Sequence, residues 1–254
     1  MAETVLVSVV LPAYNEADHI AKVVNRLIDE ISRVTTSYEL VVVDDGSTDG
    51  TLDEVEKMAS LNKSIVPIRN PRNMGKGAAV KSASRVVRGE AVILLDADMD
   101  ITPSLLAKYE ATLRKYDLCM ASKRHPESEY RAPVVRKFLS LGFNTLVRLM
   151  TGVMYSDSQT GLKAMKGAHF KRIMNMITVK KYAYDVEMLA VAELMGLRIA
   201  ELPVKINQRS LFSARAVFRM MIDLLGISYR LRVLKWYQKN LENPEPNYKP
   251  VIPI

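Results

Sequence analysis

Short apolar segments alternate with amphipathic ones along the first hundred residues. The runs at 5–12, 39–43 and 91–95 are rich in branched side chains, and 64–69 is a shorter run of the same kind. Such runs are typical of strands buried on both faces of a parallel sheet. Apolar residues at helical spacing between them predict helices over about 20–34, 52–59 and 78–87. The repeated order of strand, loop and helix predicts βαβ units with right-handed crossovers.

The second half continues this pattern less regularly. Pro103 opens a predicted helix over about 104–115, and proline is favoured in a first helical turn. A strand over 117–122, a helix over 134–151 and a short strand after the loop at 157–163 follow. A helix is predicted from residue 184 to near Gly196, which is expected as its C-cap, and a strand over 198–206. Met174 and Met176 are expected in the core or an interface.

Three acids follow the apolar run at 91–95. Asp96, Asp98 and Asp100 occupy every second position, so Asp96 and Asp98 point to one side while the chain stays extended. Two carboxylates on one side repel each other unless a cation lies between them. A divalent ion, Mg²⁺ or Mn²⁺, that links them to substrate phosphates is the favoured interpretation. The alternative is an acidic turn with Asp100 near a helix N-cap.

Composition and charge restrict the class of protein and partner. The 254 residues are 48% hydrophobic and 25% charged, so a large core is expected. The single cysteine, Cys119, excludes an internal disulfide. No basic signal-peptide region and no apolar run of membrane-spanning length is present, so the chain is not expected to be transmembrane. The net charge of +8 indicates an anionic partner. Nucleic acid is disfavoured because no helix-turn-helix or interleaved aromatic sheet motif occurs.

Positive charge concentrates in the tail. Residues 205–239 contain eight basic side chains and one acid, Asp223. Arg215, Arg219 and Asp223 share one predicted helical face, and the remaining surface is apolar. A basic amphipathic helix of this kind is expected to lie flat on an anionic membrane surface. The alternative is a helix that packs on the domain or forms a dimer surface. Residues 241–254 are expected to be an extended tail.

Four short motifs together resemble family 2 glycosyltransferases. They lie at 11–16, 43–51, 73–77 and 96–98, in the family's order. Within the family, residues 122–124, 157–163 and 184–187 make the chain similar to polyprenyl (dolichyl) phosphate hexose synthases, with the glucose branch favoured over the mannose branch. The resemblance implies a GT-A fold, an α/β domain with a mostly parallel sheet. Its limits would be 1–210, with a nucleotide-binding half at 1–100 and an acceptor half at 101–210, followed by membrane-interface helices at 211–240.

The resemblance also implies roles for individual residues. Asp96, Asp98 and Arg124 would be catalytic, and Asp98 with Asp100 would hold the metal. The nucleotide-sugar site would contain Pro12, Tyr14, Glu16, Asp44, Asp45, Lys76, Asp96, Ala97, Asp98 and Arg209. The lipid phosphate would be bound by Arg124, Arg131, Arg136 and Ser140, with Asp157 and Gln159 in the acceptor pocket. The alternatives are turn and cap roles for Glu16 and Asp44, a plain surface loop around Lys76, and a solvated basic face for the arginines.

The expected reaction is inverting transfer of a hexose to dolichyl or polyprenyl phosphate at the cytoplasmic membrane face. A phosphate acceptor is already ionised at pH 7 and needs no base, whereas a hydroxyl acceptor, such as a glycan, needs a carboxylate such as Asp157. The donor stays open between UDP-glucose and GDP-mannose, with glucose favoured. The oligomeric state also stays open.

Overall fold

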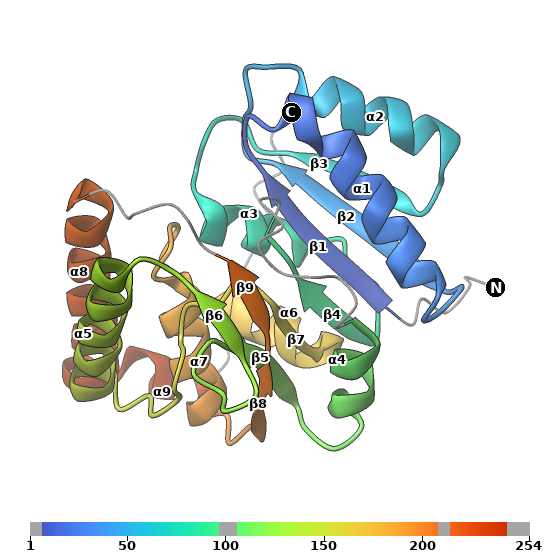
Figure 1. The fold of residues 1–254 in the computed structure, drawn as a ribbon. Helices are drawn as coiled ribbons and strands as arrows, with labels where there is room; N and C mark the ends of the chain where they lie inside the picture. Colours follow the sequence, from blue (N-terminus) through green and yellow to red (C-terminus); the bar gives the residue numbers. More distant parts are fainter. Residues whose placement is uncertain (1–6, 97–105, 208–213, 243–254) are drawn as a thin grey trace.

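A seven-stranded sheet forms the centre of the computed structural model, which describes residues 7–96, 106–207 and 214–242 (Figure 1). The strands are β1 (Val7–Ala13), β2 (Tyr38–Asp44), β3 (Ile65–Arg69), β4 (Ala91–Leu94), β5 (Leu118–Ser122), β7 (Lys163–Lys166) and β8 (Ile199–Pro203). Their order across the sheet is β3-β2-β1-β4-β7-β5-β8. Only β7 is antiparallel to its neighbours β4 and β5, so the predicted mostly parallel sheet is confirmed.

Helices connect most strands. They are α1 (Ala17–Ser32), α2 (Thr51–Leu61), α3 (Lys76–Ala83), α4 (Leu106–Leu113), α5 (Val134–Thr151), α6 (Gly167–Met176), α7 (Tyr184–Leu194), α8 (Ala214–Ser228) and α9 (Trp236–Glu242). A π-helical turn (Tyr229–Val233) joins α8 to α9. A second sheet consists of β6 (Glu129–Arg131) and β9 (Lys205–Asn207). The helix expected over 134–151 is α5, and it has the same limits in the structure.

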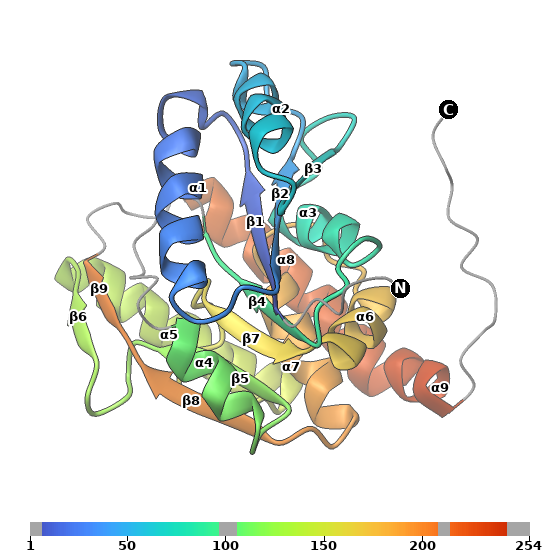
Figure 2. The same ribbon diagram turned by 90° about the vertical axis from the view of Figure 1, so that its right-hand side faces the viewer.

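Two hydrophobic cores lie on opposite faces of the large sheet. Side chains alternate along a strand, so Val9 and Leu11 enter one core while Val10 enters the other. Figure 2 shows α1 on one side of β1 and α3 on the other. The apolar runs are continuous because both faces of these strands are covered.

Three features differ from the sequence-based expectation. The predicted strand over 198–206 is two strands, and the second, β9, leaves the large sheet to pair with β6. Helix α6 was not expected, and the lysine at its N-cap position, Lys166, is not one of the residue types that mark a helix start in a sequence. Strand β7 runs antiparallel, a direction that periodicity within the strand does not encode. Met174 and Met176 of α6 are buried, as expected.

The C-terminal helices belong to the core on the α3 side of the sheet. Met220, Leu224 and Ile227 of α8 are buried in the same cluster as the strand residues, so the alternative of a helix packed on the domain is confirmed for its inner face. The outer face of α8 exposes Phe218 and Ile222. In the described part of the chain, none of the helices has the length and apolar character needed to cross a bilayer. The expected tail at 241–254 lies almost wholly outside the described residues.

The sheet order creates a switch point between β1 and β4. From β1 the chain adds β2 and β3 on one side, and then returns to place β4 on the other side. Open α/β sheets bind ligands at the carboxyl ends of the strands at such a point. In this chain those ends carry the motifs at 11–16, 43–51 and 96–98.

Candidate active site

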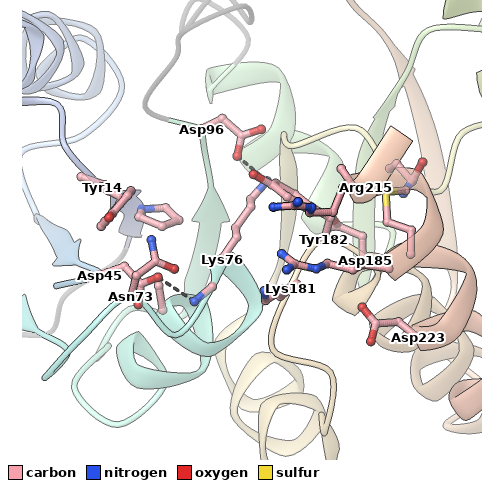
Figure 3. A pocket seen from close by; sticks show the side chains of 18 of the residues that line it. Tyr14, Asp45, Asn73, Lys76, Asp96, Lys181, Tyr182, Asp185, Arg215 and Asp223 are labelled. Atoms are coloured by element: carbon pink, nitrogen blue, oxygen red, sulfur yellow. Dashed lines mark hydrogen bonds and ion pairs between the residues drawn. The ribbon is translucent and has the colours of Figure 1, made fainter. Parts of the chain in front are cut away.

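A cavity of about 640 Å³ opens at the carboxyl ends of β1, β2 and β4. The end of β1 contributes Pro12 and Tyr14, the residue after β2 is Asp45, and Asp96 follows β4. Figure 3 shows Tyr14 and Asp45 on one side of this cavity and Arg215 of α8 on the other, with Lys76 and Asp96 between them. The cavity therefore has one half built by the first hundred residues, where the nucleotide site is predicted, and a second half built by later parts of the chain.

Asp45 organises the loop that precedes α3. Its carboxylate accepts hydrogen bonds from Asn70 Nδ2 at 2.7 Å, Met74 N at 3.1 Å and Gly75 N at 2.7 Å. Gly75 has φ +99°, and a Cβ there would lie 2.6 Å from the Lys180 carbonyl oxygen. Glycine is therefore required at this position. Asp45 is saturated by these donors, so its geometry suits shaping the loop.

Lys76 extends from this loop to the centre of the cavity. Its ammonium forms an ion pair with Asp96 and lies 5.8 Å from the centroid of the Tyr184 ring. Burial disfavours the charged amine, but the combined interactions with Asp96, Tyr184 and Asp185 outweigh it and raise the pKa of Lys76 well above its usual value. The Lys76 side chain is only 18% exposed, so the alternative of a surface loop does not agree with the structure at this residue. Lys76 instead balances the Asp96 charge.

The loop between β5 and β6 supplies part of the cavity wall on the side where the acceptor is predicted. Lys123 lines the cavity, with its Nζ 3.3 Å from Asp157 Oδ2 and 5.7 Å from the centroid of the Tyr130 ring. Burial raises the pKa of Asp157, but the Lys123 charge together with hydrogen bonds from Thr160 and from the backbone of Lys123 and Gln159 outweighs it and lowers the pKa overall. Asp157 is thus a buried, paired carboxylate, which is a poor proton acceptor.

The remaining wall comes from α5, α7, α8 and the loop before α7. Arg136 and Ser140 reach the cavity from α5, and Arg136 is 6% exposed. Asp185 of α7 accepts a hydrogen bond from the fully buried Lys163 at 2.7 Å. Lys163 also donates to the Thr160 carbonyl. This buried pair ties β7 to α7 beneath the cavity.

Most, but not all, of the site residues predicted from the sequence line this cavity. Those that line the cavity are Pro12, Tyr14, Glu16, Asp45, Lys76, Asp96, Arg136, Ser140 and Gln159. Asp44, Arg124, Arg131 and Asp157 do not line it. Ala97, Asp98, Asp100 and Arg209 lie outside the described residues. Arg124 donates from Nη1 to the Ser156 carbonyl at 2.6 Å, so its neighbour Lys123 is the cation that reaches the cavity.

Several cavity residues were not nominated as site residues. They are Asn73, Lys123, Tyr130, Lys181, Tyr182, Asp185, Arg215, Arg219 and Asp223. The stripe of Arg215, Arg219 and Asp223 was visible at four-residue spacing, but it was assigned to a membrane surface. Lys123 and Asp185 were visible inside the motifs at 122–124 and 184–187. Spacing therefore identified the groups, and the fold was needed to show which of them meet.

The described residues do not themselves complete a metal site. In residues 7–96, 106–207 and 214–242, no group of three or more His, Cys, Asp or Glu side chains is arranged to hold an ion. Asp96 is the described carboxylate of the acidic motif, and it faces the cavity. Carboxylate oxygens are suitable ligands for Mg²⁺ and Mn²⁺. The chemistry of the motif therefore fits a hard divalent ion.

Known proteins are similar to this chain in sequence and in fold. Dolichyl-phosphate beta-glucosyltransferase ALG5A of Trichomonas vaginalis is 32% identical over 246 residues, covering 92% of this chain and 76% of the relative. The dolichyl-phosphate beta-glucosyltransferase of Mus musculus is 29% identical over 253 residues, covering 91% and 78%. Glucosyl-3-phosphoglycerate synthase from Mycobacterium tuberculosis, solved with UDP, superposes with a TM-score of 0.65 at 19% identity, covering 88% and 80%.

The same synthase has also been solved with Mn²⁺, UDP-glucose and phosphoglyceric acid. That structure has a TM-score of 0.63 at 19% identity, covering 88% of this chain and 79% of the synthase. These likenesses confirm the GT-A-like fold. The family model "Glycosyl transferase family 2" matches residues 8–172, more than half of the chain. The chain therefore belongs to glycosyl transferase family 2 and is a glycosyltransferase.

Proposed function

We propose that this enzyme transfers glucose from UDP-glucose to a polyprenyl phosphate such as dolichyl phosphate, with inversion at the anomeric carbon. The dolichyl-phosphate beta-glucosyltransferases named above cover most of this chain, and this supports the lipid acceptor. The observation that carries the proposal is the second half of the cavity, where Lys123, Arg136 and two arginines of α8 gather. Cations that bring together two phosphate-bearing substrates are what this reaction requires.

The donor half supports a nucleotide sugar. Asp44 is 1% exposed and does not line the cavity, so its contact with the base stays a prediction. Tyr14 is 44% exposed at the cavity wall, where its ring can cover the base or ribose. Uracil is preferred to guanine because the relatives named above are glucosyltransferases.

The acceptor half supports a phosphate as nucleophile. Asp157 was the candidate base for a hydroxyl acceptor, but it is 5% exposed, paired with Lys123 and absent from the cavity wall. A phosphate oxygen attacks the anomeric carbon directly, so no proton has to be removed from it. Lys123, Arg136 and Ser140 are proposed to hold that phosphate. Arg124 and Arg131, which lie off the cavity wall, stay predictions.

A divalent ion is proposed as cofactor. Asp98, with Asp100, would hold Mg²⁺ or Mn²⁺ next to Asp96, and the bound ion would neutralise charge on the departing diphosphate. The metal requirement is tested with Asp98→Ala, by titrating UDP calorimetrically in Mn²⁺ and in EDTA. The wild type should bind UDP at least about tenfold more tightly with the ion, and the variant should show no difference. Equal metal dependence in both proteins would contradict the assignment.

A membrane surface is proposed on the outer sides of α5 and α8. These helices are in contact, and both present large apolar side chains to solvent. The exposed residues are Val134, Val135, Phe138, Leu141 and Leu149 of α5 and Phe218, Ile222 and Leu225 of α8. An apolar face of this kind beside a phosphate-binding cavity suits a substrate whose chain stays in the bilayer. The cytoplasmic face is where nucleotide sugars are expected to be available.

The reaction is tested with radiolabelled donors. Enzyme, short-chain polyprenyl phosphate and Mg²⁺ or Mn²⁺ are incubated with UDP-glucose or GDP-mannose, and the mixture is extracted with organic solvent. Label should enter the lipid phase from UDP-glucose, and the matched polyprenol without phosphate should stay unlabelled. Label from GDP-mannose alone would reassign the donor. No lipid label from any donor would refute the proposal.

A further inference from the structure

The polar stripe of α8 faces the cavity. Arg215, Arg219 and Asp223 follow one another at four-residue spacing, so they lie on one side of the helix, and all three line the cavity. Figure 3 shows Arg215 across the cavity from Tyr14 and Asp45. The buried side of α8 is instead formed by residues such as Leu224. The stripe is therefore a wall of the candidate active site.

The two arginines differ from Lys76 and Lys123 in having no carboxylate partner. Lys76 is paired with Asp96, and Lys123 with Asp157. Within the part of the chain that the structure describes, no carboxylate oxygen lies within 4.0 Å of the guanidinium group of Arg215 or Arg219. Both side chains are exposed to the solvent-filled cavity. Two adjacent, unneutralised guanidinium groups on a cavity wall are suited to an anion.

Helix α8 is fixed at its far end, so these side chains project from a defined backbone. Ser228 Oγ donates to the Met150 carbonyl of α5 at 2.9 Å. Farther along, Arg230 and Tyr237 donate to the buried carboxylate of Glu187 on α7. Leu224 and Ile227 of α8 are completely buried. Helix α8 is therefore held on α5, and the segment that follows it is held on α7; both of these helices carry other cavity residues.

We propose that Arg215 and Arg219 bind phosphate oxygens of a substrate in this cavity. A guanidinium group presents paired N–H donors that match phosphate geometry, which an ammonium group does not. Two phosphates are available, the acceptor monophosphate and the donor diphosphate. The contact of α8 with α5, which carries Arg136 and Ser140, favours the acceptor phosphate. This inference rests on the proposed function and adds two binding residues to it.

The experiment compares Arg215→Gln and Arg219→Gln with Arg26→Gln. Arg26 is an exposed arginine on α1, so its variant removes the same charge away from the cavity. Steady-state rates are measured with UDP-glucose and short-chain polyprenyl phosphate in neutral detergent micelles. Each cavity variant should raise the KM for polyprenyl phosphate by at least about tenfold, with the KM for UDP-glucose changed less than about twofold. Arg219→Lys should recover only part of the loss, because it keeps the charge but loses the paired donors.

The other outcomes are equally informative. A rise in the KM for UDP-glucose alone would keep phosphate binding and assign it to the donor diphosphate. Unchanged values for both substrates would overturn the inference, and so would a defect confined to sedimentation with phosphatidylserine vesicles. Calorimetric titration with polyprenyl phosphate and with UDP makes the same comparison without turnover. An inactive wild type would therefore refute the proposed reaction while the binding inference is still decided.

Discussion

Replacement of Glu187 by alanine should destabilise the protein through the C-terminal segment. The Glu187 carboxylate is completely buried and accepts five hydrogen bonds, from Thr178 N, Thr178 Oγ1, Val179 N, Tyr237 and Arg230. Its removal leaves two backbone N–H groups, two hydroxyls and a guanidinium without their acceptor. The carboxylate thus holds together the loop before α7, the π-helical turn and α9.

The expected cost follows from the burial of these groups. Breaking a buried charged pair by removing one partner costs about 3–5 kcal/mol. The Arg230 side chain is 25% exposed and can be partly hydrated after the substitution, which favours the lower end, about 3 kcal/mol. In a protein of this size, that loss corresponds to a fall in Tm of roughly 6–12 °C. Tyr237→Phe removes a single hydroxyl from the same cluster and should cost about 1–2 kcal/mol.

Urea unfolding followed by tryptophan fluorescence measures both effects. The protein has a single tryptophan, Trp236, and its ring lies edge-to-face on Tyr237 with a centroid distance of 5.1 Å. The fluorescence of Trp236 therefore reports on the region around the Glu187 carboxylate. The control is Glu56→Ala on the exposed side of α2, which should cost less than about 0.5 kcal/mol. The two cluster variants combined should cost less than the sum of their separate effects, because they share a hydrogen bond. A cost of Glu187→Ala below about 1 kcal/mol would refute the account of the π-helical turn and α9 as segments fixed by this carboxylate.

Three further predictions concern the cavity and its support. Gly161→Ala would drive a Cβ into the Asp96 carboxylate; kcat/KM should fall at least about tenfold with little change in Tm, and equal activity would show that Asp96 can move freely. Asp157→Asn should keep substantial glucosyl transfer to polyprenyl phosphate, whereas complete loss would favour a hydroxyl acceptor. Hydrogen bonds from Arg198 and Lys166 lower the pKa of Asp117. Its stabilisation is complete above about pH 4 and is lost progressively as the pH falls below that, so Asp117→Asn should cost up to about 1 kcal/mol at pH 7 and a steadily smaller amount as the pH is lowered toward about 2 in urea unfolding.

The strands around the switch point could be predicted from the sequence, because each is an apolar run covered on both faces. Val41 and Val42 of β2, for example, enter opposite cores, so an uninterrupted apolar run was needed. The direction of β7 was not predictable, because the side-chain pattern of a short strand is the same whichever way it runs. The break at Val204 was missed for a related reason: the alternating pattern continues through it while the partner strand changes.

The candidate site was predicted unevenly, and α8 explains why. Periodicity correctly grouped Arg215, Arg219 and Asp223 on one face, since that depends only on helix geometry. What that face meets depends on how the C-terminal segment packs, with α8 on α5 and with Tyr237 of α9 on Glu187 of α7, fifty residues apart in the sequence. A charged helical face looks the same in the sequence whether it meets lipid headgroups, water or a substrate phosphate. The structure separates these cases, because the polar stripe turns toward the cavity while Phe218 and Ile222 turn outward. The two proposals therefore give one helix two roles: its apolar face would contact the bilayer, and its polar stripe would contact the phosphate of a substrate embedded in it.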